Sequence, residues 1–122
     1  EEAGVKMQTY QGGCHCGTVR FEATTDLATV ISCNCSHCSK RGLLPTFVPP
    51  DRFRLISGED ALEDYQFNRR VIHHLRCRHC GIESFARGKT PDGNDVVAVN
   101  VRCLDGVDIE SLKLTPYNGR DF

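Results

Sequence analysis

The sequence has no long apolar run, no internal repeat and no low-complexity linker, and its charges nearly cancel. A transmembrane helix requires about 20 consecutive apolar residues, so we expect no membrane partner. The formal net charge is -1, and only six Phe and three Tyr are present. Nucleic-acid binding depends on a basic surface, and single-strand binding also on aromatic side chains, so we expect no nucleic-acid partner either.

The beginning of the chain also lacks the layout of a secretory leader. Residues Glu1 to Gly4 are acidic, and no basic stretch followed by an apolar stretch is seen there. We therefore expect a cytoplasmic protein in a reducing compartment, where cysteine clusters favour metal over disulfides. The length of 122 residues fits one domain. We place this domain at residues 10–122, after an N-terminal extension of residues 1–9.

The side-chain pattern predicts a mainly β fold, a small zinc-bound domain of short antiparallel strands. Glycine and proline mark turns at short intervals, and the segments between them alternate with period two or are rich in β-branched residues. The strand candidates are residues 18–23, 52–56, 71–75 and 96–101. Helical signals are limited to single turns at residues 36–41 and 108–113, the second with Asp108 as its cap.

Cysteine is abundant in the sequence, and seven of the eight cysteines fall into three tight clusters. The clusters are Cys14-His15-Cys16-Gly17, Cys33-Asn34-Cys35-Ser36-His37-Cys38 and Cys77-Arg78-His79-Cys80-Gly81. Thiolates this close together suit a soft divalent metal, since the backbone pairs neighbouring ligands in advance. Seven ligands are enough for one closed four-thiolate site and one three-thiolate site with an open position.

The first and third clusters predict a structural zinc site. Cys77 and Cys80 have the spacing of a zinc knuckle, and Gly81 can take the positive φ that such a turn often demands. Cys14 and Cys16 are closer together, and neighbouring glycines permit the sharp bend that they need. A tetrahedral site that joins the two pairs would cross-link opposite ends of the domain and stabilise its fold.

The second cluster predicts a different kind of site. Cys33, Cys35 and Cys38 offer three thiolates within one short turn, and no fourth cysteine lies nearby in the sequence. A metal with three protein ligands keeps a fourth position for water or substrate, as catalytic zinc does. We expect this second zinc to be held more loosely, so that its occupancy can be partial. One alternative stays open, in which His37, Cys103 or another residue closes a purely structural site.

The remaining cysteine and histidine patterns have plainer interpretations. Disulfides are disfavoured by the CxC spacing, and a redox CxxC by the lack of a thioredoxin-like βαβ context. Cys103 follows an apolar strand, so we expect a small buried hydrophobic side chain. His73 and His74 are neighbours in a predicted strand, so one of them should face inward as a core histidine. Three histidines inside the clusters are expected to face solvent: His15, His37 and His79.

Three segments resemble, in order, the signatures of the glutathione-dependent formaldehyde-activating enzyme family, whose domain is shared with centromere protein V. The segments are residues 10–22, 33–38 and 74–82, and the resemblance extends from residue 10 to about residue 105. It implies a β-rich fold with two zinc sites. It assigns the structural zinc to Cys14, Cys16, Cys77 and Cys80, and the catalytic zinc to Cys33, Cys35 and Cys38.

The resemblance also implies an activity, the condensation of formaldehyde with glutathione and the reverse cleavage of the carbon–sulfur bond. We therefore expect a zinc-dependent carbon–sulfur lyase-type enzyme that acts on a thiol adduct of a small carbonyl compound, with a thiol such as glutathione as partner. Three thiolates weaken the Lewis acidity of a metal, which suits thiol exchange better than hydrolysis. The alternative is a non-catalytic, zinc-stabilised protein-binding module, in which the second metal has no exchangeable ligand.

Overall fold

The computed structural model describes residues 7–67 and 72–119 and confirms the mainly β fold. The strands are β1 (Gln8–Gly13), β2 (Arg20–Thr25), β3 (Val30–Cys33), β4 (Pro45–Val48), β5 (Phe53–Ser57), β6 (Leu62–Tyr65), β7 (His73–Cys77), β8 (Glu83–Lys89), β9 (Asp95–Asn100) and β10 (Leu114–Tyr117). The helical elements are α1 (Ser36–Arg41) and the 3-10 turns η1 (Pro50–Arg52), η2 (Glu59–Ala61), η3 (Val101–Cys103) and η4 (Ile109–Ser111). Within these two ranges, no helix has the length and apolar character needed to cross a membrane.

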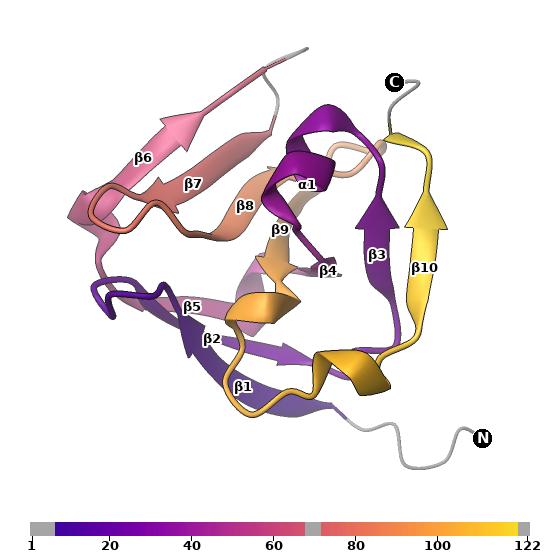
Figure 1. The fold of residues 1–122 in the computed structure, drawn as a ribbon, viewed down its shortest axis with the longest axis horizontal. Helices are drawn as coiled ribbons and strands as arrows, with labels where there is room; N and C mark the ends of the chain where they lie inside the picture. The colour runs from indigo at the N-terminus through magenta and orange to yellow at the C-terminus, as the bar shows by residue number, and fades with distance from the viewer. Residues whose placement is uncertain (1–6, 68–71, 120–122) are drawn as a thin grey trace.

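The strands form two antiparallel sheets and one parallel pair (Figure 1). The three-stranded sheet has the order β1-β2-β5, and the five-stranded sheet has the order β4-β9-β8-β7-β6. β10 pairs with β3 in parallel, with Leu114 opposite Val30 and Tyr117 opposite Cys33. This pair departs from the predicted antiparallel pattern. Parallel strands need a long crossover connection, and here most of the domain lies between the two strands.

The core lies between the three-stranded and five-stranded sheets. The ring of Phe53 on β5 lies 5.4 Å from that of Phe21 on β2 and 4.7 Å from that of Phe85 on β8. Val97 and Val99 of β9 are also buried. These contacts confirm the strands predicted at residues 18–23, 52–56 and 96–101, because their apolar faces are the ones that pack here.

The helical turns form where they were predicted. α1 spans Ser36–Arg41, and the side chain of Cys35 caps it by accepting a hydrogen bond from the Cys38 N–H. Asp108 caps η4 in the same way, accepting from the N–H of Glu110. The predicted strand at residues 71–75 begins at His73 as β7, while Val71 lies outside the described residues.

The two faces of the five-stranded sheet have different surroundings. Phe85 and Val99 are register partners that face the core, so the next residues, Ala86 and Ala98, face the opposite side. That second face is turned toward α1 and the β3–β10 pair (Figure 1). The space between them contains the candidate functional site.

Candidate metal centres and cavity

Four cysteines from opposite ends of the domain meet at one point. Cys14 and Cys16 follow β1, Cys77 ends β7, and Cys80 lies in the turn before β8. Their sulfur atoms all lie within 4.8 Å of one another, and Cys16 Sγ is 3.7 Å from both Cys14 Sγ and Cys77 Sγ. With Zn–S bonds of about 2.3 Å, the sulfurs of a tetrahedral site lie about 3.8 Å apart. The donor set therefore fits a zinc ion.

The turns that carry these cysteines reverse at glycines. Gly17 has φ 84° and Gly81 has φ 78°, in the left-handed region that glycine enters without steric cost. Backbone N–H groups in both turns point at sulfur, since Val19 donates to Cys14 Sγ at 3.3 Å and His79 donates to Cys77 Sγ at 3.4 Å. Such donors stabilise thiolates, the form that binds metal.

The thiols of this group differ in their readiness to ionise. Hydrogen bonds with the side chain and backbone of Thr18 lower the pKa of Cys16 to about 6. Burial raises the pKa of Cys77 to about 11, and its side chain is fully buried. Metal binding must therefore release a proton from Cys77 at neutral pH, whereas Cys16 gives up its proton more readily.

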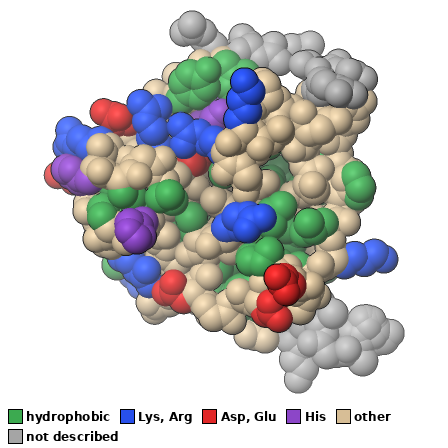
Figure 2. Space-filling model, in the orientation of Figure 1, with side chains coloured by type: hydrophobic (Ala, Val, Ile, Leu, Met, Phe, Trp, Pro, Cys, Tyr) green, Lys and Arg blue, Asp and Glu red, His purple; other side chains and the backbone are tan. Residues whose placement is uncertain are grey.

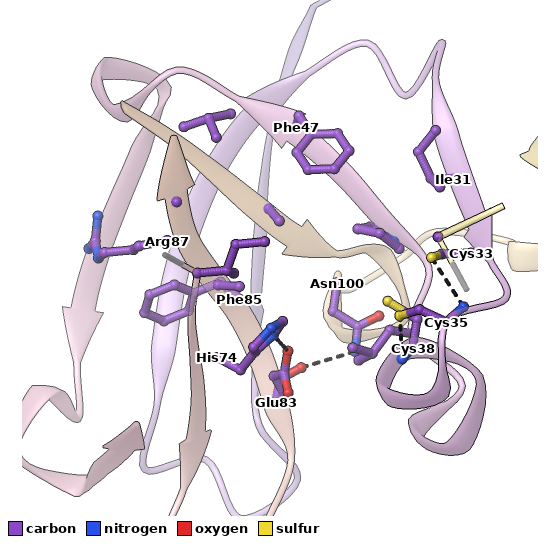
Figure 3. Close-up of a pocket in the computed structure, with 18 of the residues that line it drawn as sticks. Ile31, Cys33, Cys35, Cys38, Phe47, His74, Glu83, Phe85, Arg87 and Asn100 are labelled. Atoms are coloured by element: carbon purple, nitrogen blue, oxygen red, sulfur yellow. Dashed lines mark hydrogen bonds and ion pairs between the residues drawn. The ribbon is translucent and has the colours of Figure 1, made fainter. Parts of the chain in front are cut away.

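The second cluster is built around the beginning of α1. Cys33 ends β3, Cys35 caps α1 and Cys38 lies in its first turn. The three sulfurs lie within 4.8 Å of one another. The N–H of Cys35 donates to Cys33 Sγ, and the N–H of Cys38 donates to Cys35 Sγ, both at 3.4 Å (Figure 3). The strand end and the helix cap thus hold three sulfurs in one small volume.

The group of three sulfurs takes in no fourth histidine, cysteine or carboxylate from the described part of the chain. Cys103 is half-buried against the core, where Asn100 Nδ2 lies 3.6 Å from its sulfur. Burial raises the pKa of Cys103, as it does that of Cys38. Burial also acts on Cys35, but hydrogen bonds from the backbone of Cys38 and neighbouring groups outweigh it and lower its pKa.

The prediction that His37 faces solvent is wrong. Its side chain is 7% exposed, and its Nε2 lies 2.9 Å from Glu83 Oε1. Glu83 Oε2 lies 3.1 Å from Nδ1 of His74, and Arg41 Nε lies 3.7 Å from Glu83 Oε1. Burial lowers the pKa of His37, although Glu83 opposes that shift. Because His37 and Arg41 belong to α1, the buried Glu83 carboxylate fastens the cysteine-bearing helix to β7 and β8.

His74 is 8% exposed, so it is the buried member of the His73–His74 pair, as the sequence predicts, while His73 is exposed. His74 pairs with Ala86, however, and so lies on the cavity face of the sheet and not in the core between the two sheets. His15 and His79 are also exposed. His37, His74 and Glu83 form a third group whose potential ligand atoms lie within 4.8 Å of one another, and the sequence analysis did not identify Glu83. The inward face of β7 was a signal for His74, but no local pattern marks Glu83.

A cavity of about 320 Å³ opens beside the second cluster. Its lining includes the three clustered cysteines together with His74 and Glu83 (Figure 3). Its floor is the second face of the five-stranded sheet, and β3 and β10 contribute Ile31 and Tyr117 to its walls. On the face seen in Figure 2, hydrophobic side chains gather near the centre beside a basic side chain. The three cysteine sulfurs therefore border a space that can admit a small molecule.

Comparisons with known proteins agree with this arrangement. The crystal structure of a Rhodobacter sphaeroides protein is similar, with a TM-score of 0.77 and 32% sequence identity over 88% of this chain and 99% of that chain. The sequence profile described as "Glutathione-dependent formaldehyde-activating enzyme" matches residues 9–117. This match covers all three cysteine clusters and confirms the resemblance found in the sequence. The chain therefore belongs to the glutathione-dependent formaldehyde-activating enzyme family.

Proposed function

We propose that this protein is a zinc-dependent carbon–sulfur lyase-type enzyme, which joins a thiol to a small carbonyl compound and cleaves the adduct in the reverse direction. Family membership supports a function of the glutathione-dependent formaldehyde-activating kind. The observation that carries the proposal is a three-thiolate cluster that borders a cavity. A substrate needs both an open coordination position and space beside it, and a purely structural site needs neither.

The two cysteine groups would hold two zinc ions with different roles. The structural zinc would be held by Cys14, Cys16, Cys77 and Cys80, and the catalytic zinc by Cys33, Cys35 and Cys38. A zinc ion held by Cys33, Cys35 and Cys38 would favour the thiolate form of a substrate thiol bound beside them. A closed four-sulfur site has no such position, and its role is to stabilise the fold.

The chain's own residues provide a route for the proton. Glu83 lies beside Arg41 and is 4% exposed, and its carboxylate accepts from Nδ1–H of His74. In the tautomer with the proton on Nδ1, Nε2 is an acceptor, and this buried nitrogen has no hydrogen-bond partner among the residues that the structure describes. His74 also lines the cavity. We propose that it takes the thiol proton as the carbon–sulfur bond forms and passes it to the carbonyl oxygen, after a shift of its neighbours that exposes Nε2.

The same sites support a proposal for the cellular setting and the chain organisation. All eight cysteines are free, and metal–thiolate sites require reduced cysteines, so we place the protein in the cytoplasm. We also propose that residues 10–122 form the zinc-binding domain and residues 1–9 its N-terminal extension, with β1 starting at Gln8, just before that boundary.

A titration of cobalt-loaded protein with glutathione tests the proposal. We expect glutathione to shift the thiolate-to-metal absorption of the second site, and Cys35→Ala to remove that shift. Exchange of formaldehyde with its glutathione adduct, followed by NMR, should accelerate only with the intact cluster. If thiols leave the spectrum of a fully loaded second site unchanged, the site is closed and the protein-binding module takes the place of the enzyme.

A further inference from the structure

The floor of the cavity carries unusually small side chains for the middle of a sheet. Ala86 on β8 pairs with Ala98 on β9, with Phe47 of β4 on one side of this pair and His74 of β7 on the other. Directly opposed residues in neighbouring strands place their Cβ atoms about 5 Å apart. Two alanines between a phenylalanine and a histidine therefore leave a hollow, and the cavity occupies it.

The walls of the cavity are also mainly apolar. Ile31, Leu43, Pro45 and Val96 line it along with Phe47. Polar side chains of the lining are the three cysteines, Asn100, His74, Glu83 and Tyr117, together with Arg87 and Lys89. A ligand over the alanine floor would therefore meet apolar side chains over most of its surface, with the cysteines to one side.

Within residues 7–67 and 72–119, the cations that line the cavity already have partners. The Arg87 guanidinium carbon lies 5.3 Å from the ring centroids of Phe53 and Phe85, and Lys89 Nζ lies 2.6 Å from Asp95 Oδ1. Glutathione carries two carboxylates, an ammonium group and two amides. Burying such groups without partners is costly, so the apolar part of the cavity, over Ala86 and Ala98, is poorly suited to the charged groups of glutathione.

The volume of the cavity also indicates a substrate with a sizeable apolar group. An apolar cavity of about 150 Å³ holds benzene, and this one has about 320 Å³. The formaldehyde adduct of a thiol adds only a hydroxymethyl group at the sulfur, which would leave most of the space empty. The cavity has room for a phenyl ring or a branched alkyl chain.

We propose that the substrate of this site carries an apolar group, aryl or branched alkyl, which fills the cavity over Ala86 and Ala98. This inference rests on the proposed function and names its substrate class. The apolar group can enter on either reactant, the carbonyl compound or the thiol, because both are joined at the carbon–sulfur bond that forms beside the cysteines.

The reaction needs no further reagent. A thiol R–SH and an aldehyde R′–CHO give R–S–CH(OH)–R′, so one carbon–sulfur bond forms while the carbonyl π bond opens. The thiol proton ends on the carbonyl oxygen, carried there by a general base, the role proposed above for His74. Cleavage reverses these steps, and no atom is oxidised or reduced overall.

Three reactant pairs test the proposal on zinc-loaded protein, with adduct exchange followed by NMR. The pairs are glutathione with formaldehyde, glutathione with 3-phenylpropanal, and 2-phenylethanethiol with formaldehyde. We expect one of the two phenyl-bearing pairs to exceed the first by about tenfold or more in kcat/KM, as a well-filled apolar pocket allows. The faster of the two phenyl-bearing pairs identifies which reactant, the carbonyl compound or the thiol, carries the apolar group.

The other outcomes separate the two proposals. If glutathione with formaldehyde is the best pair, the apolar-substrate inference is overturned while the proposed function stands. If no pair is accelerated although both metals are bound, the proposed function fails and the inference fails with it. Binding of 2-phenylethanethiol to the cobalt-loaded protein gives a readout independent of turnover, and we expect it to bind more tightly than glutathione.

Substitutions in the lining of the cavity test where the apolar group of the substrate binds. Ala98→Leu should lower the ratio of kcat/KM for the better phenyl-bearing pair over the formaldehyde–glutathione pair by about tenfold, because the larger side chain fills the hollow. Val96→Ala, which enlarges the cavity, should leave that ratio high and admit a bulkier group. The matched control is Ala28→Leu, the same change at an exposed alanine outside the lining. A ratio unaffected by Ala98→Leu in folded, metal-loaded protein would overturn this placement.

Discussion

Cys16 and Cys77 are sixty-one residues apart in the sequence, and their sulfur atoms lie 3.7 Å apart. Cys16 lies between β1 and β2 of the three-stranded sheet, and Cys77 ends β7 of the five-stranded sheet. A zinc ion in this group would therefore tie together the two sheets that enclose the core. Closing so long a loop in the folded state makes metal binding and folding parts of one equilibrium.

The first prediction is that Cys77→Ser removes one zinc per chain and destabilises the fold. A loss of about 3 kcal/mol, a modest share of the binding free energy of structural zinc, would lower the Tm by about 10 °C. Metal analysis and thermal unfolding measure the two effects. Cys103→Ser is the control, since Cys103 lies outside the ligand group. An unchanged Tm with full metal content in Cys77→Ser would contradict the structural role.

The sequence predicted the parts of the fold that have local signals. Strand β9 shows a run of valines, and the turn η4 follows Asp108, a residue type that commonly caps helices. Strands such as β6 and β10 have four residues each, too few for alternation to stand out. Pro116 within β10 also argues against a strand, because proline cannot donate to the ladder.

The parts of the site that depend on the spacing of residues along the chain were predictable from the sequence. The parts that depend on how the strands pair were not. Thiolate spacing pointed to both cysteine groups. The contact between His37 and Glu83 joins residues forty-six positions apart, and nothing near either residue marks it. The cavity floor likewise exists because β8 and β9 pair Ala86 with Ala98, a register that neither strand reveals alone.

The second prediction concerns the three-cysteine cluster. Cys35→Ala should remove the second metal and lower carbon–sulfur exchange by about 100-fold or more, because the fourth-position chemistry depends on that metal. The fold should stay within about 1 kcal/mol of wild type, since the other group still ties the sheets together. Zinc stoichiometry, NMR exchange and chemical denaturation test these outcomes together. Unfolding as severe as that of Cys77→Ser would show that the cluster is structural.

The third prediction concerns the buried carboxylate. Glu83→Gln should destabilise the protein by about 1–3 kcal/mol, because an amide cannot accept from both histidines and leaves Arg41 without its charge partner. Zinc at the second cluster should also bind more weakly, as α1 loses its anchor. Glu63→Gln is the control, because Glu63 is 48% exposed in its 3.1 Å pair with Arg76, and exposed pairs contribute about 0.5 kcal/mol. Equal effects of the two substitutions would contradict the anchoring role.

The fourth prediction concerns pH. Burial and the neighbouring thiols raise the pKa of Cys38, so its thiol is protonated at neutral pH in the metal-free protein. Zinc must displace that proton, and protons compete with the metal. The apparent zinc affinity of the second cluster should therefore rise by about tenfold for each pH unit between about pH 6.5 and 8.5. Competition with a chelator, corrected for its own protonation, measures the slope, and an affinity independent of pH would contradict the assignment of Cys38 as a ligand.

The fifth prediction concerns a glycine that touches the second cluster. A Cβ added at Gly119 would lie 2.6 Å from Cys33 Sγ and 3.3 Å from Cys35 Cβ, closer than packed atoms tolerate. Gly119→Ala should therefore displace Cys33 and weaken zinc binding at the second cluster by about tenfold or more, while the four-cysteine group keeps its metal.

Gly93→Ala separates this effect from the general cost of replacing a glycine. Gly93 has φ 90° and open space around its Cα, so alanine there strains the backbone without pressing on either metal group. Gly93→Ala should lower the Tm and leave both zinc affinities unchanged. Gly119→Ala should instead weaken zinc binding at the second cluster and leave the Tm nearly unchanged. Zinc competition and thermal unfolding on the two variants distinguish the cases. If Gly119→Ala retained wild-type affinity at the second cluster, the close approach of the C-terminal segment to Cys33 would have no part in shaping that site.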